Sequence, residues 1–291
     1  MIALTIGLAV FVGISLGLLG GGGSILTVPL LAYVAGMDAK QAIATSLLVV
    51  GVTSAIGAIS HARAGRVQWR TGLIFGGAGM VGAYGGGLLA RFIPGTVLLI
   101  GFAVMMIATA IAMLRGRKNV DAAEGGHHLP VPTIIAEGLV VGLVTGLVGA
   151  GGGFLVVPAL ALLGGLPMPV AVGTSLIVIA MKSFAGLGGY LSSVQINWTV
   201  ALAVTAAAVV GALVGARLTA KVNPDVLRKA FGWFVLAMSS VILAQEIHPS
   251  VGIATAILTA IAAAMTFACT RYTYCPLRRL VGARALEPAA V

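Results

Sequence analysis

Charged residues are scarce in this chain. Asp, Glu, Lys and Arg make up 8% of its 291 residues, whereas 59% are hydrophobic. Ordinary soluble domains carry about 25% charged residues, so this composition argues against a soluble fold. A helix that crosses a bilayer needs roughly 20 apolar residues. We therefore predict an all-α integral membrane protein embedded in the lipid bilayer, with room for about eight or nine such segments.

Acidic side chains are missing from the middle of every predicted span. The chain has seven: Asp38, Asp121, Glu124, Glu137, Asp225, Glu246 and Glu287. The apolar segments contain no paired carboxylates, no nucleophile beside a base and no cluster of metal ligands, so neither an enzyme nor a metal or cofactor site is expected. The usual carboxylate relay for protons or sodium ions is also disfavoured.

Cysteine is rare, and the start of the chain lacks the features of a secretory leader. Cys269 and Cys275 lie in a C-terminal segment that we predict to be cytoplasmic, where thiols stay reduced. The apolar first 19 residues have no basic start and no small-residue cleavage pattern, so no signal peptide is predicted. The net charge of +10 comes from basic residues in short gaps between apolar runs. That pattern indicates orientation in a membrane rather than nucleic-acid binding.

Glycine, by contrast, is abundant, with 42 residues, and the sequence repeats itself. Proline, hydroxyl and tryptophan residues recur at a spacing of 129 positions without a gap. The shift places Pro29 on Pro158, Thr45 on Thr174, Ser46 on Ser175, Ser54 on Ser183 and Trp69 on Trp198. The chain is therefore predicted to contain two copies of one structural unit.

Each copy is predicted to begin with a glycine-broken apolar run, at 2–36 and 133–166, followed by three helices. The helices are expected at 42–60, 72–90, 96–114, 171–189, 198–218 and 226–244, with an unpaired one at 251–268. The predicted domains are a first membrane repeat (1–114), a cytoplasmic linker (115–132), a second membrane repeat (133–244) and a last helix with a basic cytoplasmic tail (245–291). His127 and His128 in the linker are interpreted as part of a solvated loop rather than a metal site.

The distribution of charge predicts that the two copies are inverted. The loop at 61–70 carries His61, Arg63, Arg66 and Arg70, whereas its counterpart at 191–198 has no charge. Because basic loops stay cytoplasmic, the N-terminus is predicted outside and the C-terminus inside the cytoplasmic membrane. All strongly basic loops lie on the cytoplasmic side if each glycine-broken run is a re-entrant hairpin, which returns to the side of the membrane that it entered. If each hairpin were instead two full spans, the number of membrane crossings would still be even, so the charge distribution leaves that alternative open.

The hairpin tips are the first candidate site. A glycine cluster before a helix start leaves backbone N–H groups free at the positive end of the helix dipole, which favours an anion. Packing alone is the alternative, because membrane helices use glycine for close contact. The tip residues predicted to bind substrate are Gly20, Gly21, Gly22, Gly23 and Ser24 in the first copy, and Gly149, Gly151, Gly152 and Gly153 in the second.

Hydroxyl residues that follow the hairpins are the second candidate. Thr45 and Ser46, and their repeat equivalents Thr174 and Ser175, are predicted near helix starts. There they could cap the helices, as hydroxyls often do, or line a central substrate site. Both alternatives are retained.

Lys182 is the third candidate, because it stands in the middle of an apolar helix. Charges within a membrane are costly and usually face a cavity or a partner. Lys182 follows Ser175 by seven residues, so both point to one face, and an anion is the missing partner. Snorkelling to the interface is the alternative. Its repeat equivalent is Thr53, while Arg91 and Arg217 lie near helix ends and are interpreted as interfacial anchors.

The glycine-rich hairpin ending in Pro29, repeated before Pro158 and Gly173-Thr174-Ser175, resembles the sulfite exporter TauE/SafE family of membrane transporters. The likeness covers nearly the whole chain. The first copy departs from the pattern at Ala44, which aligns with Gly173. The resemblance implies a permease for small sulfur-containing anions, including sulfite and organosulfonates.

The sequence thus predicts a secondary transporter that exports such an anion by alternating access, with a substrate site at the repeat interface near the midplane. An anion channel without an occluded state is the alternative. A membrane scaffold is disfavoured, since the short loops offer little docking surface. Small-residue faces such as 76–87 could serve a homodimer or the internal core.

Overall fold

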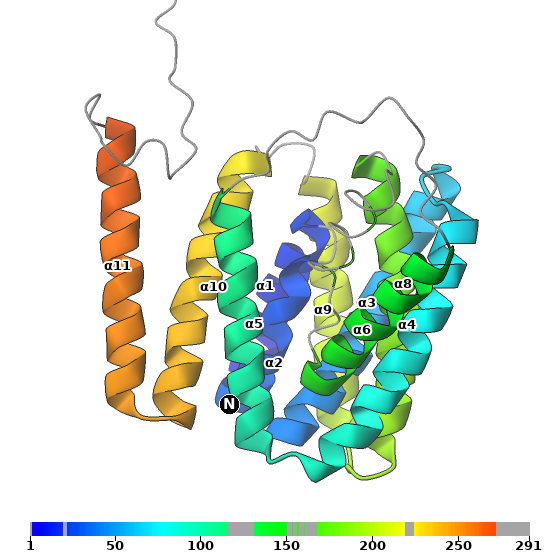
Figure 1. The fold of residues 1–291 in the computed structure, drawn as a ribbon, viewed down its shortest axis with the longest axis horizontal. Helices are drawn as coiled ribbons and strands as arrows, with labels where there is room; N and C mark the ends of the chain where they lie inside the picture. The colour runs from blue at the N-terminus through cyan, green and yellow to red at the C-terminus, as the bar shows by residue number, and fades with distance from the viewer. Residues whose placement is uncertain are drawn as a thin grey trace, which may run out of the picture. The chain divides into compact units, whose positions relative to one another are not determined.

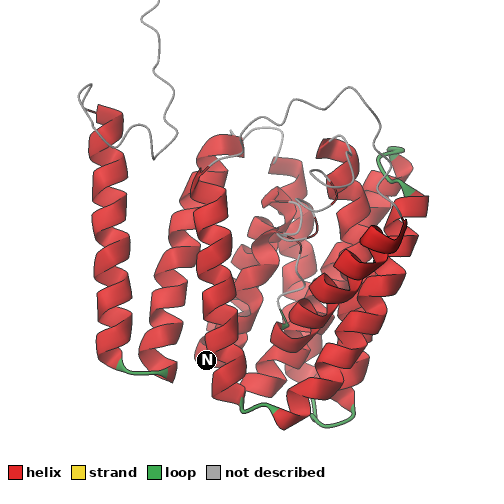
Figure 2. Ribbon diagram, viewed as in Figure 1, coloured by secondary structure: helices red, strands yellow, loops and turns green. Residues whose placement is uncertain are grey.

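The computed structural model describes residues 2–19, 22–115, 131–149, 168–218 and 224–271, together with Gly153, Val156 and Leu160. All regular structure in these residues is helical (Figure 2). The remainder of the predicted linker, most of the second hairpin and the C-terminal tail, including Cys275, lie outside the described residues. The elements are α1 (Ile2–Leu19), η1 (Gly22–Leu26), α2 (Thr27–Pro29), η2 (Leu30–Val34), α3 (Ala39–Arg63), α4 (Trp69–Leu89), η3 (Ala90–Phe92), α5 (Gly95–Arg115), α6 (Val131–Val148), α8 (Met168–Leu191), α9 (Trp198–Leu218), α10 (Pro224–Glu246) and α11 (Pro249–Arg271).

Packing divides the chain into two compact units. Unit 1 comprises residues 1–102 and 120–227, and unit 2 comprises residues 103–119 and 228–291. In unit 2, α10 meets the end of α5 where Gly232 lies against Leu114, and α11 meets α10 where Gly252 lies against Ala244. The candidate site residues all belong to unit 1.

All seven predicted long helices are present, and each begins and ends within three residues of its predicted bounds. Four of the described helical segments are long and apolar enough to cross a membrane: Ala39–Arg63, Trp69–Phe92, Val170–Leu191 and Trp198–Leu218. Apolar stretches in α5, α10 and α11 are shorter, at Gly95–Ile111, Gly232–Glu246 and Pro249–Ala262. The prediction of an all-α membrane protein is confirmed.

Helix α3 begins earlier than predicted because Asp38 caps it. The Asp38 carboxylate accepts a hydrogen bond from the backbone N–H of Lys40, which satisfies one of the orphan donors of the first turn. Thr45 and Ser46 consequently lie in the second turn rather than at the helix start. Helix α8 likewise begins at Met168, well before Thr174. The alternative that these hydroxyls cap their own helices is wrong.

The 129-residue shift relates the observed elements closely. It maps α1 onto α6 and α4 onto α9 residue for residue, and the first residues of α3 and α5 onto those of α8 and α10. The packing is reciprocal: α1 lies against α9, α6 lies against α4, and α3 lies against α8. The hairpin helix of each repeat is therefore held by a helix of the other repeat.

Glycines bring these helices into backbone contact. A Cβ on any of them would overlap backbone atoms of the facing helix, so a larger residue cannot fit without displacing it. The contacts in the two equivalent pairs are Gly13 with Ala208 and Gly17 with Ala212, and Gly142 with Gly79 and Gly146 with Ala83. In each contact of the second helix pair, both residues are the repeat equivalents, 129 positions away, of the residues in the matching contact of the first pair. Such small-residue packing is how helices associate in lipid, where no hydrophobic force drives them together.

Two loops of unit 1 lie at opposite ends of that unit (Figure 1). One is the basic loop that joins α3 to α4, and the other is its uncharged counterpart between α8 and α9. Trp69 and Trp198, the first residues of α4 and α9, are each about half exposed, at 56% and 50%. Exposed tryptophan at a helix end is typical of the membrane interface. The described first hairpin also folds back, since η1 and η2 pack against α1.

Two glycines of α4 offer a test of the packing. Gly82 faces the backbone of Leu139 and Leu143 in α6, whereas a Cβ on Gly77 would meet nothing within 4 Å. We expect Gly82→Ala to lower the stability by about 1–3 kcal/mol through overpacking. Gly77→Ala should be neutral or stabilising by up to about 1 kcal/mol, because alanine favours the helix. Thermal unfolding in detergent measures both, and equal effects would contradict the assigned contact.

Candidate functional site

The first hairpin tip is only partly described. Gly20 and Gly21 lie outside the described residues, Gly22 and Gly23 begin η1, and Ser24 is fully buried. From Gly22 the chain runs through a short 3-10 turn, one α turn and a π turn. Thr27, in the α turn, has a buried hydroxyl with no hydrogen-bond partner among the described residues. The segment is thus irregular and holds a polar group that a ligand could satisfy.

The second tip begins at Gly149, which ends α6 with φ of 74°. Glycine is needed there, because this backbone conformation is strained for other residues and a Cβ would stand 2.5 Å from the Ile43 side chain. The carbonyl of Gly149 accepts a hydrogen bond of 3.0 Å from the Ser46 hydroxyl. Gly151 and Gly152 lie outside the described residues, and Gly153 is buried. Two predicted site residues from different repeats, Ser46 and Gly149, are therefore brought together.

The four predicted hydroxyl residues have different surroundings. Thr45 is 1% exposed, and its hydroxyl has no partner among the described residues. The Thr174 hydroxyl accepts a hydrogen bond of 3.0 Å from the Gln68 backbone N–H, while the Ser175 hydroxyl donates to Val172 in its own helix. Gly173 next to them packs against Arg66 of the basic loop. Thr174 and Ser175 thus lie beside this loop, and Thr45 and Ser46 lie beside Gly149.

Lys182 stands in the middle of α8 and is 1% exposed. Its aliphatic stem passes Gly79 of α4, where a Cβ would lie 3.8 Å from the lysine Cβ. The ammonium nitrogen is buried and has no hydrogen-bond partner among the described residues. Snorkelling requires the ammonium to reach the interface, so the buried position of this group speaks against that alternative.

Lys182 belongs to a central polar group that also contains Ser183, Thr53 and Ser54. Lys182 and Ser183 are the repeat equivalents of Thr53 and Ser54. All four are less than 5% exposed. The Thr53 hydroxyl donates to its own helix, whereas those of Ser54 and Ser183 have no described partner.

Contacts between α3 and α8 place the four residues at one level along these two helices. Gly51 of α3 faces Phe184, and Gly57 faces Leu176, so the two contacts bracket Thr53 and Ser54 on one side and Lys182 and Ser183 on the other. The selection of site residues from the sequence missed Ser54 and Ser183. Their recurrence at mid-helix in both repeats is the signal that could have found them.

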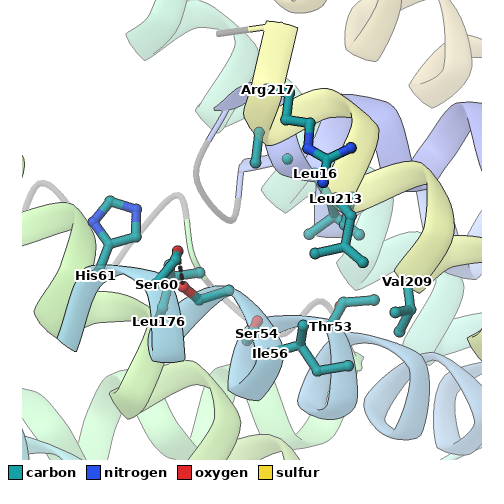
Figure 3. A pocket seen from close by; sticks show the side chains of 14 residues that line it. Leu16, Thr53, Ser54, Ile56, Ser60, His61, Leu176, Val209, Leu213 and Arg217 are labelled. Atoms are coloured by element: carbon teal, nitrogen blue, oxygen red, sulfur yellow. Dashed lines mark hydrogen bonds between the residues drawn. The ribbon is translucent and has the colours of Figure 1, made fainter. Parts of the chain in front are cut away.

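Unit 1 also contains a cavity of about 360 Å³ between α1, α3, α8 and α9 (Figure 3). Its polar lining comes from Thr53, Ser54, Ser60 and His61 of α3 and from Arg217 of α9. The Nδ1 atom of His61 is buried without a described partner. Sequence reasoning missed this cavity because the separation of two helices leaves no local pattern. Within the described residues, no group of His, Cys, Asp and Glu is arranged to hold a metal ion.

The Ser46 contact can be tested against its repeat equivalent. Ser46→Ala removes a buried hydrogen bond between repeats and leaves the Gly149 carbonyl with one partner fewer, so we expect a loss of about 1 kcal/mol in unfolding free energy. Ser175→Ala removes only a bond within α8 and should change stability by less than about 0.5 kcal/mol. Thermal or denaturant unfolding in detergent gives both values. A larger loss of stability in the Ser175 variant would contradict the assignment of an inter-repeat hydrogen bond to Ser46 but not to Ser175.

Comparison with known proteins places the chain among membrane transporters. The family model "Sulfite exporter TauE/SafE" matches residues 5–242. A "Probable membrane transporter protein" of Xylella fastidiosa strain Temecula1 is 36% identical over 242 residues, covering 81% of this chain and 92% of the relative. YunE of Bacillus subtilis, with the same description, is 32% identical and covers 71% and 84%. A relative from Methanocaldococcus jannaschii is 29% identical, with 76% and 89% covered. No solved structure gave a significant match.

Proposed function

Because the chain belongs to the sulfite exporter TauE/SafE family, we propose that it is a secondary transporter for a small sulfur-containing anion, such as sulfite or an organosulfonate. The family and its relatives are membrane transporters rather than enzymes, and the apolar helices suit that role. The substrate, the alternating-access mechanism and the cytoplasmic membrane location are the parts that we propose.

The buried Nζ atom of Lys182, which has no hydrogen-bond partner among the described residues, is the observation that carries the proposal. A charge without a partner in an apolar interior is strongly unfavourable. No described side chain pairs with Lys182, and the sequence between 150 and 167 contains no Asp or Glu. An anionic ligand would supply the missing charge. The unpartnered hydroxyls of Ser54 and Ser183 would supply hydrogen bonds at the same level of the interface.

Two inverted repeats, each with a re-entrant hairpin, are the arrangement that we propose. The reciprocal packing of α1 with α9 and α6 with α4 supports it, as do the equivalent loops at opposite ends of unit 1 (Figure 1). Transporters of this plan hold substrate near the midplane at the repeat interface. The N-terminus would then lie outside and the C-terminus in the cytoplasm. A homodimer would use the open sides of Gly77 and Gly85 on α4, where nothing lies within 4 Å.

Export is the direction that the membrane voltage favours. An inside-negative potential drives an anion outward with about 2.3 kcal/mol per charge per 100 mV. None of the four described helices that are long and apolar enough to cross a membrane contains an acidic residue, so the proposed export does not depend on a carboxylate relay in these helices. The voltage acting on the anion supplies the driving force.

Replacing Lys182 with methionine separates a ligand-binding role from a structural one. Lys182→Met keeps the length of the stem and removes an unpaired buried charge, so we expect the ligand-free protein to become more stable. Sulfoacetate at about 100 times its Kd should stabilise the wild type by about 2.7 kcal/mol and leave the variant unchanged. Thermal unfolding in detergent, with and without sulfoacetate, sulfate or chloride, measures both effects.

Lys40→Met is the control, since Lys40 lies at the start of α3 and its ammonium reaches the Arg91 carbonyl. This variant should bind the anion as the wild type does. A Lys182→Met protein that is less stable without ligand, or that retains the full ligand shift, would refute the role assigned to Lys182.

A carrier and a channel differ in exchange across the membrane. In vesicles loaded with unlabelled sulfoacetate, a carrier should accumulate external labelled sulfoacetate transiently against its gradient. Each time the carrier releases unlabelled sulfoacetate outside, its binding site can take up labelled sulfoacetate and carry it into the vesicle. The measurement is uptake of the label over time, with empty vesicles as the control. Flux without such counterflow, at rates far above those of carriers, would favour the anion channel.

A further inference from the structure

The residues that line the cavity between α3 and α9 differ in size and polarity from their repeat equivalents. Shifted by 129 residues, the position of the cavity falls between α8 and α4. There Tyr190 replaces His61 and is fully buried, with its hydroxyl donating to the Leu147 carbonyl at 2.5 Å. Leu88 replaces Arg217, and Lys182 replaces Thr53. Among these described residues, α4 and α8 pack closely where α3 and α9 border the cavity.

Side-chain size explains the difference. Helices α4 and α8 meet through glycine, where a Cβ on Gly87 would stand 2.6 Å from the Gly186 carbonyl, and one on Gly189 would stand 2.6 Å from that of Tyr84. The equivalents of Gly87 and Gly189 on α9 and α3 are Ala216 and Ser60, and both line the cavity. Helices α3 and α9 cannot approach as closely, because these side chains stand between them.

The polar groups around the cavity suit an anion. Arg217 extends from α9, and Ser54 lies on α3 opposite (Figure 3). The Ser54 hydroxyl is buried at 1% exposure without a described partner, and so is Nδ1 of His61. No acidic residue lines the cavity. Because it lies beside the C-terminal turns of α1, α3 and α9, whose carbonyl ends repel an anion, binding would depend on the Arg217 guanidinium.

The cavity also has an apolar wall and more room than an inorganic oxyanion needs. Leu16, Leu176 and Leu213 form part of that wall. Its volume of about 360 Å³ lies in the range of pockets that hold small organic ligands. An anionic head at Arg217 with a short carbon chain on the leucines would satisfy both parts of the lining.

We propose that this cavity is an access site for an organic sulfonate, which enters beside Arg217 and reaches Ser54 before it pairs with Lys182. The inference rests on the proposed transport function and adds a second site to it. Ser54 is shared by the cavity and the central polar group, so a ligand in the cavity already touches α3 at the level of Lys182 on α8. The Lys182 stem itself lies against Gly79 of α4. The basic loop and Arg217 identify the predicted cytoplasmic side as the side of entry.

Thiol labelling tests the site directly, in full-length protein in which Cys269 and Cys275 are replaced by serine. Ser54→Cys should react with the anionic reagent 2-sulfonatoethyl methanethiosulfonate, and its repeat equivalent Ser183→Cys should not. Sulfoacetate at about ten times its Kd should slow the Ser54→Cys reaction about tenfold, because it leaves about one cavity in eleven free. Arg217→Gln should raise the Kd about tenfold, the loss of one charge-assisted hydrogen bond, so the same sulfoacetate concentration should slow the reaction only about twofold. Arg217→Lys should restore part of the protection.

The neutral reagent methyl methanethiosulfonate is the control for access alone, and its rate should not change in Arg217→Gln. If Ser54→Cys does not fold, Ser60→Cys on the same wall takes its place. An unreactive cavity thiol, equal reactivity at position 183, or a rate that sulfoacetate does not alter would overturn the inference. If any of these results is found while transport still depends on Lys182, the cavity proposal fails and the proposed transport function stands. If the cavity thiol is labelled and protected by sulfoacetate but the protein does not transport, the cavity proposal stands and the proposed transport function fails.

Discussion

Backbone contact between helices of different repeats is the constraint on which the rest of the structure depends. Glycines of α1 lie on α9 and glycines of α6 lie on α4, at positions related by the repeat. In lipid these contacts provide the van der Waals energy that replaces the hydrophobic effect. They also fix where α6 ends, so that Gly149 meets Ile43 and accepts a hydrogen bond from Ser46. The glycine-broken segments are therefore positioned by the repeat to which they do not belong.

This exchange leaves α3 and α8 facing each other in the middle of unit 1. At this level the two helices carry Lys182, Ser54 and Ser183, whose polar atoms have no partner among the described residues, and the Lys182 stem lies against Gly79 of α4. Each such group costs stability, about 1–3 kcal/mol for a neutral one and more for a charge. A fold selected for stability alone would place apolar residues there. The retained cost is explained if a ligand satisfies these groups, because binding and function often require a site that is unfavourable when empty.

The sequence predicted the helices well because long apolar runs and an ungapped repeat are strong signals. It predicted their ends less well: a predicted start at 42 overlooked Asp38, which caps α3 from outside the apolar run. Lys182 could be selected because a charge in an apolar helix is visible locally. The Ser46–Gly149 pair joins residues 103 positions apart, and the cavity depends on how closely two helices approach. Neither property is encoded in a local pattern.

Divergence between the repeats makes the two equivalent helix pairs, α3–α9 and α4–α8, structurally different. With identical halves, the α3–α9 and α4–α8 interfaces would exchange open and closed forms at equal free energy. Here glycines allow α4 and α8 to close, while Ser60 and Ala216 hold α3 and α9 apart. Tyr190 adds a hydrogen bond to the closed side, where the open side has His61. The same substitutions place the buried lysine in one repeat and the cavity beside the other, so the proposed anion would meet the cavity before it reaches Lys182.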